Sequence, residues 1–240
     1  MRIVIFVYLF FLFSIIIKAE QLDIIKVATA TDFPPFVTVK EGELTGFDID
    51  LLKAMALKLK KTIKFLPMES NYVLSTVASN LADLGAGGFS ITEERKKIVD
   101  FTAPYFDSGF VLVTRKSSKD LDINKLYNKK VGTYMNDVSS HYIKTLGLDK
   151  NILYGKYDFL FNELITGEID AIFIDYPFAK YMLSHNYKDI LKITGPLYFP
   201  HQYAFIIKKN HLLKNEIDRA IENILSSSTY QKIYSKWFED

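Results

Sequence analysis

The most informative segment of this sequence is Gly87-Gly88-Phe89-Ser90-Ile91-Thr92-Glu93-Glu94-Arg95-Lys96-Lys97. The segment 82–86 before it predicts a buried strand, and glycines after a strand let the backbone approach a ligand closely. Thr92 predicts the start of a short helix, with Arg95 one turn further along. A guanidinium there is able to turn back toward the strand end and hold a carboxylate through two parallel charged hydrogen bonds. A glycine turn with a surface arginine is the alternative that these residues leave open.

Strand patterns and helical patterns alternate on both sides of this segment. Residues 24–29 and 62–66 predict strands, and the helix expected between them, over 48–60, repeats its apolar residues at helical spacing. The other predicted elements are helix 71–80, strands 82–86 and 131–134, helices 139–146 and 158–166, strand 171–174, and helices 177–184, 214–225 and 229–238. This alternation predicts an α/β fold of βαβ units around parallel sheets.

A weak internal sequence repeat indicates two similar lobes. Asn80-Leu81-Ala82-Asp83 and Gly167-Glu168-Ile169-Asp170 each follow a predicted helix and precede an apolar strand. Two strand-like runs after prolines, 110–115 and 203–207, are the candidate crossings between lobes. The expected division is a signal peptide over 1–19, a first lobe over 20–106, a second lobe over 107–200, and a return to the first lobe over 201–240.

The N-terminal residues 1–19 have the layout of a secretory signal peptide. Met1-Arg2 supplies a positive start, residues 3–17 are apolar except for Ser14, and Ala19 offers a cleavage site. An uncleaved anchor is the alternative, but this run is shorter than the roughly 20 residues that cross a bilayer. With no cysteine, the chain has neither a disulfide nor the lipid-bearing cysteine of a lipoprotein. We expect a soluble periplasmic protein once the signal is removed.

Composition and motifs exclude several functional classes. Hydrophobic residues make up 49% of the 240, charged residues 24%, and the net charge is +2, so neither disorder nor the basic footprint of a nucleic-acid binder is indicated. Metalloprotease, serine-hydrolase and phosphate-loop signatures are missing. The four histidines show no ligand spacing, and we expect surface positions for His141, His185, His201 and His211. Neither a metal nor a cofactor is predicted.

Six segments, in order along the chain, resemble the family 3 bacterial extracellular solute-binding proteins, the polar amino-acid receptors of ABC importers. They are Phe33-Pro34-Pro35-Phe36, Gly46-Phe47-Asp48-Ile49-Asp50-Leu51, Ser90-Ile91-Thr92-Glu93-Glu94-Arg95, Val131-Gly132, 167–171 with Asp175, and 230–238. The resemblance implies a two-lobed periplasmic binding protein (type II) with a hinge of two crossover segments. It also implies a monomer that closes around a free amino acid and is recognised by a membrane permease.

The resemblance also assigns roles to residues at the predicted cleft. Arg95 and the Ser90 N–H would hold the ligand α-carboxylate, while the Ser90 hydroxyl and the Gly88 carbonyl would face the α-ammonium. Asp175 would complete the ammonium site from the second lobe, at a strand end where ligands of α/β sheets bind. An N-cap for the helix that begins near Pro177 is the alternative for Asp175.

The remaining expected contacts select the ligand side chain. Phe33 would pack on it, unless it packs only in the core, and Ser70 stands where relatives carry an aromatic residue, with Tyr72 able to swing into that space. Tyr134 and Ile174 would lie near the zwitterion. Ala30 replaces an aspartate of relatives, and Asp32 is expected to face elsewhere. We therefore expect a preference for neutral amino acids.

The loop before helix 139–146 departs from the family pattern. Asn136-Asp137-Val138-Ser139 replaces a loop of the Gly-Thr-Thr type. The Val138 amide, at a helix start, is still expected to donate to the ligand carboxylate. Asp137 adds an unexpected negative charge beside it.

Two other functions remain as alternatives. A periplasmic cyclohexadienyl (prephenate or arogenate) dehydratase-like enzyme is built on the same fold, but it usually lacks the ammonium site that Asp175 would complete. The sensor lobe of a signalling receptor is disfavoured because no membrane-spanning run follows in this sequence.

Overall fold

The computed structural model describes residues 24–135, 137–148 and 150–239. The predicted signal peptide over 1–19 lies outside the described residues. Within those ranges, no helix has both the length and the apolar character that a membrane crossing requires.

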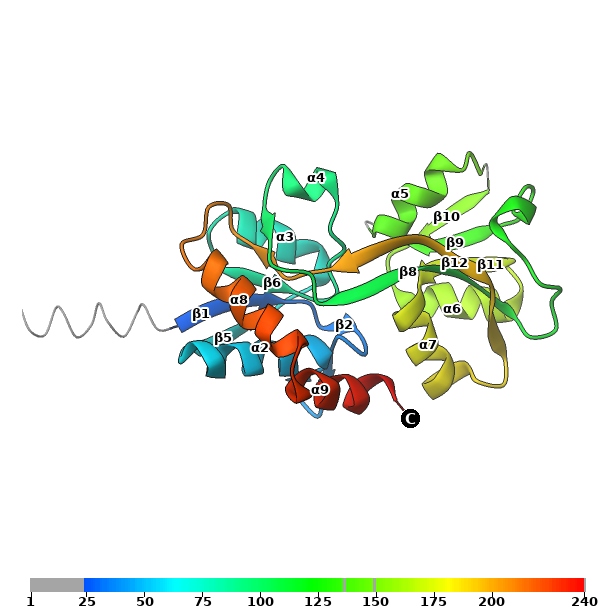
Figure 1. Cartoon of the computed structure of the whole chain (residues 1–240). Helices are drawn as coiled ribbons and strands as arrows, with labels where there is room; N and C mark the ends of the chain where they lie inside the picture. The colour runs from blue at the N-terminus through cyan, green and yellow to red at the C-terminus, as the bar shows by residue number, and fades with distance from the viewer. Residues whose placement is uncertain (1–23, 136, 149, 240) are drawn as a thin grey trace, which may run out of the picture.

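The first lobe is built on a five-stranded sheet with the order β5-β1-β6-β13-β7 (Figure 1). Its strands are β1 (Ile24–Thr29), β5 (Thr62–Pro67), β6 (Leu84–Ala86), β7 (Asp100–Phe101) and β13 (Ile206–Ile207). β1 pairs in parallel with β5 and β6, whereas β13 runs antiparallel to both of its neighbours. The expected parallel pairing therefore holds for β1, β5 and β6, and the returning chain adds β13 in the opposite direction.

Helices and a small antiparallel sheet complete this lobe. Helix α2 (Phe47–Leu59) packs against β5, and α3 (Ser70–Ala78) against β1 and β6. The last two helices, α8 (Lys214–Leu225) and α9 (Ser228–Phe238), pack on α2, as expected from the sequence. The other elements are β2 (Asp32–Phe33), β3 (Val37–Lys40), β4 (Glu43–Thr45) and the short helix α4 (Glu93–Lys96).

The second lobe has its own five-stranded sheet, with the order β10-β9-β11-β8-β12. Its strands are β8 (Phe106–Arg115), β9 (Val131–Tyr134), β10 (Asn151–Tyr154), β11 (Ala171–Asp175) and β12 (Leu191–Tyr203). The helices packed on it are α5 (Val138–Thr145), α6 (Tyr157–Thr166) and α7 (Tyr176–Met182), and short 3-10 and π turns cover Ile123–Lys125 and Leu183–Tyr187.

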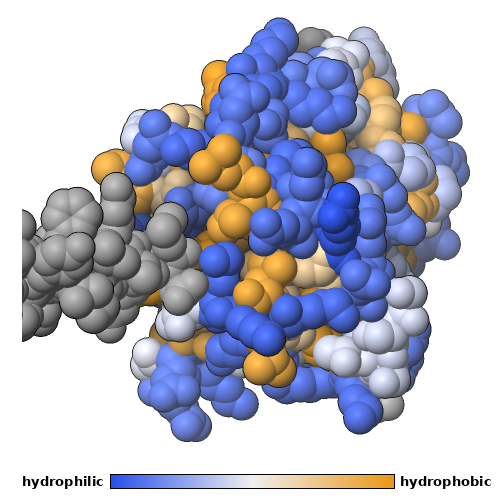
Figure 2. All heavy atoms as spheres, turned by 60° about the vertical axis from the view of Figure 1, so that its left-hand side comes forward, coloured by the Kyte–Doolittle hydropathy of each residue, from blue (hydrophilic) through white to orange (hydrophobic). Residues whose placement is uncertain are grey.

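Two neighbouring segments join the lobes. β8 and β12 pair in antiparallel fashion from Phe106↔Tyr203 onward, and together they run from one lobe to the other (Figure 1). The run 110–115 lies wholly inside the second sheet, so this expected crossing is wrong by a few residues. The chain crosses instead through the first residues of β8 and the last residues of β12, where Phe106 pairs with Tyr203. The face shown in Figure 2 is mostly hydrophilic, with hydrophobic side chains in small separate groups.

Candidate functional site

A cavity of about 360 Å³ is lined by residues of both lobes, a volume in the range of small-molecule sites. All the predicted site residues except Val138 are in its lining. The full lining is Asp32, Phe33, Glu69, Ser70, Asn71, Gly87, Gly88, Phe89, Ser90, Arg95, Tyr134, Met135, Asp137, Gly155, Lys156, Tyr157 and Asp175.

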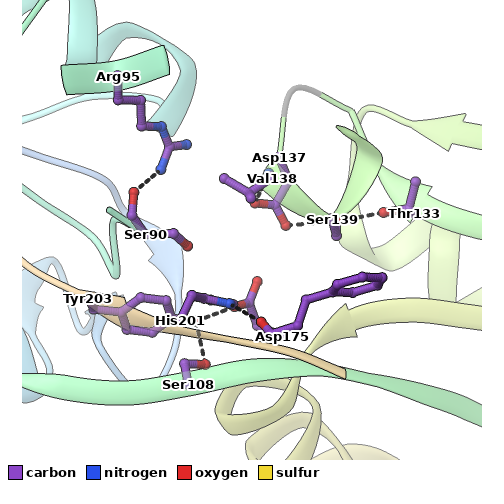
Figure 3. Close-up of polar contacts among 11 residues, drawn as sticks. Ser90, Arg95, Ser108, Thr133, Asp137, Val138, Ser139, Asp175, His201 and Tyr203 are labelled. Carbon is purple, nitrogen blue, oxygen red and sulfur yellow. Dashed lines mark hydrogen bonds and ion pairs between the residues drawn. The ribbon is translucent and has the colours of Figure 1, made fainter. Parts of the chain in front are cut away.

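Arg95 reaches the cavity from helix α4. Thr92 caps this helix by accepting the Arg95 backbone N–H at 3.2 Å, so the local structure follows the sequence prediction. The guanidinium turns back as expected, and its Nη1 donates to the Ser90 carbonyl at 2.9 Å (Figure 3). Burial lowers the pKa of Arg95, while the charges of Asp137 and Asp175 act in the opposite direction. A buried cation of this kind favours an anionic partner.

The glycine pair in front of Arg95 is held from behind by Asp48, a fully buried residue of α2. Its Oδ2 accepts the N–H groups of Gly87 at 2.8 Å and Gly88 at 3.0 Å. Gly88 has a φ of 64°, and a Cβ there would lie 2.5 Å from the Phe33 ring. Burial raises the pKa of Asp48 to about 6, against the effect of its hydrogen-bond donors. This carboxylate fixes the turn that exposes backbone to the cavity.

Phe33 lines the cavity and also packs against other aromatic rings, so the core packing that the sequence left as an alternative is present. Its side chain lines the cavity, and its ring stacks on Phe178 of α7, with centroids 5.1 Å apart and planes within 5°. It also contacts Phe36 and Tyr203. The residue therefore joins the first lobe to the second and forms one apolar surface of the cavity.

Asp175 ends strand β11 and projects from the second lobe. Only 2% of it is exposed, and its Oδ1 accepts the Tyr203 hydroxyl and lies 3.3 Å from His201 Nε2. It occupies the N-cap position of α7, but its side chain makes no capping hydrogen bond. The N-cap alternative is thus met by position alone, and the carboxylate is held toward the cavity by Tyr203 and His201.

His201 supports Asp175 from the crossover strand β12. Its side chain is only 8% exposed, so the expectation of a surface position for His201 is wrong. The same expectation is wrong for His211, whose side chain is 12% exposed and lies 3.4 Å from Asp83. Burial lowers the pKa of His201, but the hydrogen bond and charge of Asp175 outweigh burial and raise it. The Tyr203 hydroxyl, in turn, is 3.1 Å from the Ser108 hydroxyl.

Val138 does not reach the cavity with its amide. The N–H at the start of α5 donates instead to Oδ1 of Asp137, at 2.6 Å. The amide expected for the ligand carboxylate is therefore occupied in this structure by a carboxylate of the chain itself. Asn136, in the same loop, lies outside the described residues.

The lining is richer in carboxylates than the sequence indicated. Asp32 lines the cavity, so the expectation that it faces elsewhere is wrong, and Glu69 lines it as well. Burial raises the pKa of Asp32, and the nearby charge of Glu69 adds to the rise. Burial and the Asp32 charge also raise the pKa of Tyr134, which stacks on Tyr157 with centroids 4.2 Å apart.

Several expectations about neighbouring residues are not met. Tyr72 is 57% exposed and is not in the lining, so it does not swing into the space beside Ser70. Ile174 is buried away from the cavity in strand β11. Sequence reasoning missed Glu69 and Lys156, although each follows the end of a strand, at the edge of a sheet where ligands gather.

The cavity lining offers both positive and negative side chains, and the described residues contain no assembled metal site. Across residues 24–135, 137–148 and 150–239, no group of three or more His, Cys, Asp or Glu side chains could hold a metal ion. One guanidinium and one carboxylate, Arg95 and Asp175, face the same cavity from different lobes (Figure 3). Such a pair is suited to a molecule that carries both charges, because burying a zwitterion requires a partner for each.

Comparisons with known proteins identify relatives along nearly the whole chain. The chain is 31% identical over 232 residues to the arginine-binding periplasmic protein of Mannheimia haemolytica, covering 94% of this chain and 95% of the relative. It is 28% identical to ABC transporter arginine-binding protein 1 of Escherichia coli (strain K12), over 92% and 93% of the two chains. A solved structure, an ancestral arginine-binding protein bound to arginine, is 34% identical, with a TM-score of 0.82 and coverage of 90% and 98%.

The family model described as bacterial extracellular solute-binding proteins, family 3, matches residues 25–240. That match spans both lobes and every residue of the cavity lining. The chain belongs to the bacterial extracellular solute-binding proteins of family 3.

Proposed function

We propose that this protein is the binding component of an ABC importer for a cationic amino acid, of the kind represented by arginine. The amino acid occupies the cavity between the lobes, with its α-carboxylate on Arg95 and Ser90 and its α-ammonium on Asp175. Gly88, Phe33, Ser70 and Tyr134 surround the rest of it. The names of the relatives, two of them arginine-binding proteins, support this ligand class.

The observation that carries the ligand class is the charge of the lining. Four carboxylates line the cavity, from Asp32, Glu69, Asp137 and Asp175, against the cations of Arg95 and Lys156. The charge of Glu69 adds to the rise in the pKa of Asp32, and a ligand cation beside the two carboxylates would relieve this repulsion. The sequence-based preference for neutral amino acids assumed that no such carboxylate was available, and that premise is wrong.

The wider setting follows from the family. Family 3 proteins are extracellular solute-binding proteins, so the dehydratase alternative has no support from the comparisons. The proposal includes export to the periplasm through the signal over 1–19 and recognition by a membrane permease. A monomeric state and the absence of a nucleic-acid partner remain predictions.

A calorimetric panel of arginine, lysine, glutamine, leucine and aspartate tests the ligand class. Wild type should bind arginine or lysine most tightly. The double variant Asp32→Asn/Glu69→Gln should lose about 10- to 100-fold in affinity for them, the effect of removing charged hydrogen bonds. Glu222→Gln, an exposed change on α8, is the matched control and should bind like wild type. Binding of neutral or acidic amino acids alone would contradict the proposal.

A further inference from the structure

Asp137 stands at the start of α5, a point of the cavity where the second lobe favours an anion. It is the N-cap of α5, and its Oδ1 accepts the Val138 N–H at 2.6 Å. Its Oδ2 accepts the Ser139 hydroxyl at 3.0 Å. Because Ser139 donates its only hydroxyl proton to Asp137, its 2.6 Å contact with Thr133 is donated by Thr133. The Val138 N–H and the Ser139 hydroxyl thus donate directly to the Asp137 carboxylate, and Thr133 donates to Ser139 behind it.

The same carboxylate faces Arg95 across the cavity (Figure 3). Among the charges that act on the pKa of Arg95, the charge of Asp137 has the largest effect. A helix start and a guanidinium are the two groups that attract a free carboxylate to such a site. The Asp137 carboxylate therefore already occupies the hydrogen-bond donors at the start of α5, and its charge already acts on Arg95, as a ligand carboxylate would.

We infer that Asp137 competes with the ligand α-carboxylate for the start of α5, so that the amino acid binds with uptake of a proton and binds more tightly as the pH falls. The inference rests on the proposed function, since it assumes an amino acid whose carboxylate lies on Arg95. The protonation state of Asp137 would thus set the pH range in which the start of α5 accepts a ligand carboxylate.

The direction of the effect follows from like charges at one site. In the free protein, burial and the charge of Asp175 raise the pKa of Asp137 to about 7, with Arg95 acting in the opposite direction. A ligand carboxylate beside it raises that pKa further. Above about pH 7 the free protein has lost the proton that the bound protein keeps, so binding takes up a proton and weakens as the pH rises. Once protonated, Asp137 is a donor to the ligand carboxylate.

Other groups around Asp137 either do not titrate in this range or act with the opposite sign. Burial raises the pKa values of Tyr134 and Tyr157, so both remain neutral, and Arg95 remains charged. His201 titrates nearby, but its charge acts through Asp175: protonated His201 weakens the hold of Asp175 on an ammonium. The charged groups elsewhere in the lining are Asp32, Glu69 and Lys156.

The test is calorimetry with L-arginine at pH 6, 7 and 8, in pairs of buffers with different ionisation enthalpies. Wild type should take up close to one proton per ligand at pH 8, and its Kd should rise up to about tenfold from pH 7 to pH 8. Asp137→Asn keeps an N-cap acceptor and gains an amide donor. It should bind about tenfold more tightly than wild type at pH 8, with no proton uptake. His201→Gln removes the group of opposite sign, so it should take up at least as many protons as wild type.

Two results would overturn the inference. Weaker binding by Asp137→Asn would mean that Asp137 pairs with a cation of the ligand. Equal affinity and equal proton uptake in the variant and wild type would mean that Asp137 has no part in binding, and a thermal melt confirms that the variant is folded. If wild type binds a neutral amino acid in place of arginine, the proposed ligand class fails, and the same pH series with that amino acid still decides the role of Asp137.

Discussion

The segment Gly87–Arg95 and the carboxylates Asp137 and Asp175 face the same cavity, but they are held in different ways. The first-lobe segment is fixed through backbone groups: buried Asp48 accepts two glycine N–H groups, and the Ser90 carbonyl accepts from Arg95. The second-lobe carboxylates are held by side chains that themselves titrate or rotate, such as His201 and Ser139. One side is therefore a fixed cationic anchor, and the other is a set of negative charges whose strength depends on pH.

The difference suggests a division of labour in recognition. A guanidinium keeps its charge at every pH that the protein meets, so under the proposed function Arg95 would supply affinity for any α-amino acid. In the same proposal, Asp175 opposite pairs with the α-ammonium, Asp137 makes the acceptance of the α-carboxylate depend on pH, and Asp32 and Glu69 on the first lobe add the selection for a cation. Changes to the two sides should therefore produce different kinds of effect.

The largest expected effect is on the fixed side. Arg95→Ala should raise the Kd for the amino acid by at least about 100-fold, since an unpaired buried carboxylate costs about 3–5 kcal/mol. Calorimetry measures it, and Lys97→Ala, an exposed neighbour at the end of α4, is the matched control. Binding by Arg95→Ala within about threefold of wild type would remove the anchor from this account.

The next effect concerns the stability of the same side. Because burial raises the pKa of Asp48 from 3.8 to about 6, the neutral acid stabilises the fold below about pH 4, and this contribution is lost as the pH rises through about 6. The two pKa values differ by an amount equivalent to roughly 3 kcal/mol. Asp48→Asn should therefore show a free energy of unfolding that falls less, or rises more, between pH 4 and pH 7 than that of wild type.

Urea unfolding at both pH values measures this difference. Other carboxylates, such as Asp83 and Asp170, have lowered pKa values and change the slope of both proteins alike. Equal slopes in wild type and Asp48→Asn would show that the buried carboxylate does not titrate in this range.

The sheet cores were predictable because each βαβ unit carries its own local pattern. Strands β1 and β9 and helices α2 and α6 lie within a residue or so of their predicted ranges. Strand β12 was missed, since its sequence contains Gly195, Pro196 and Pro200. Its pairing with β8 shifts register twice, and as an edge strand it tolerates prolines that a central strand would not.

The fixed side of the cavity was predictable for the same reason. Its residues are close in sequence, and Thr92, Arg95 and the glycines belong to one turn. The roles of Asp32, Glu69 and His201 depend on where distant strands end relative to one another, which no local pattern reports. For His201 a signal existed: His201 and Tyr203 are two residues apart in a strand and so share a face.

The most direct test of the account is the distance between the lobes with and without ligand. The chain has no cysteine, so Tyr72→Cys on α3 and Phe159→Cys on α6 introduce one spin label on each lobe at exposed positions. If the amino acid binds between Arg95 and Asp175, saturating L-arginine should shorten the mean label distance and narrow its distribution. An unchanged distribution in a double variant that calorimetry shows to be fully bound would contradict binding by closure of the two lobes.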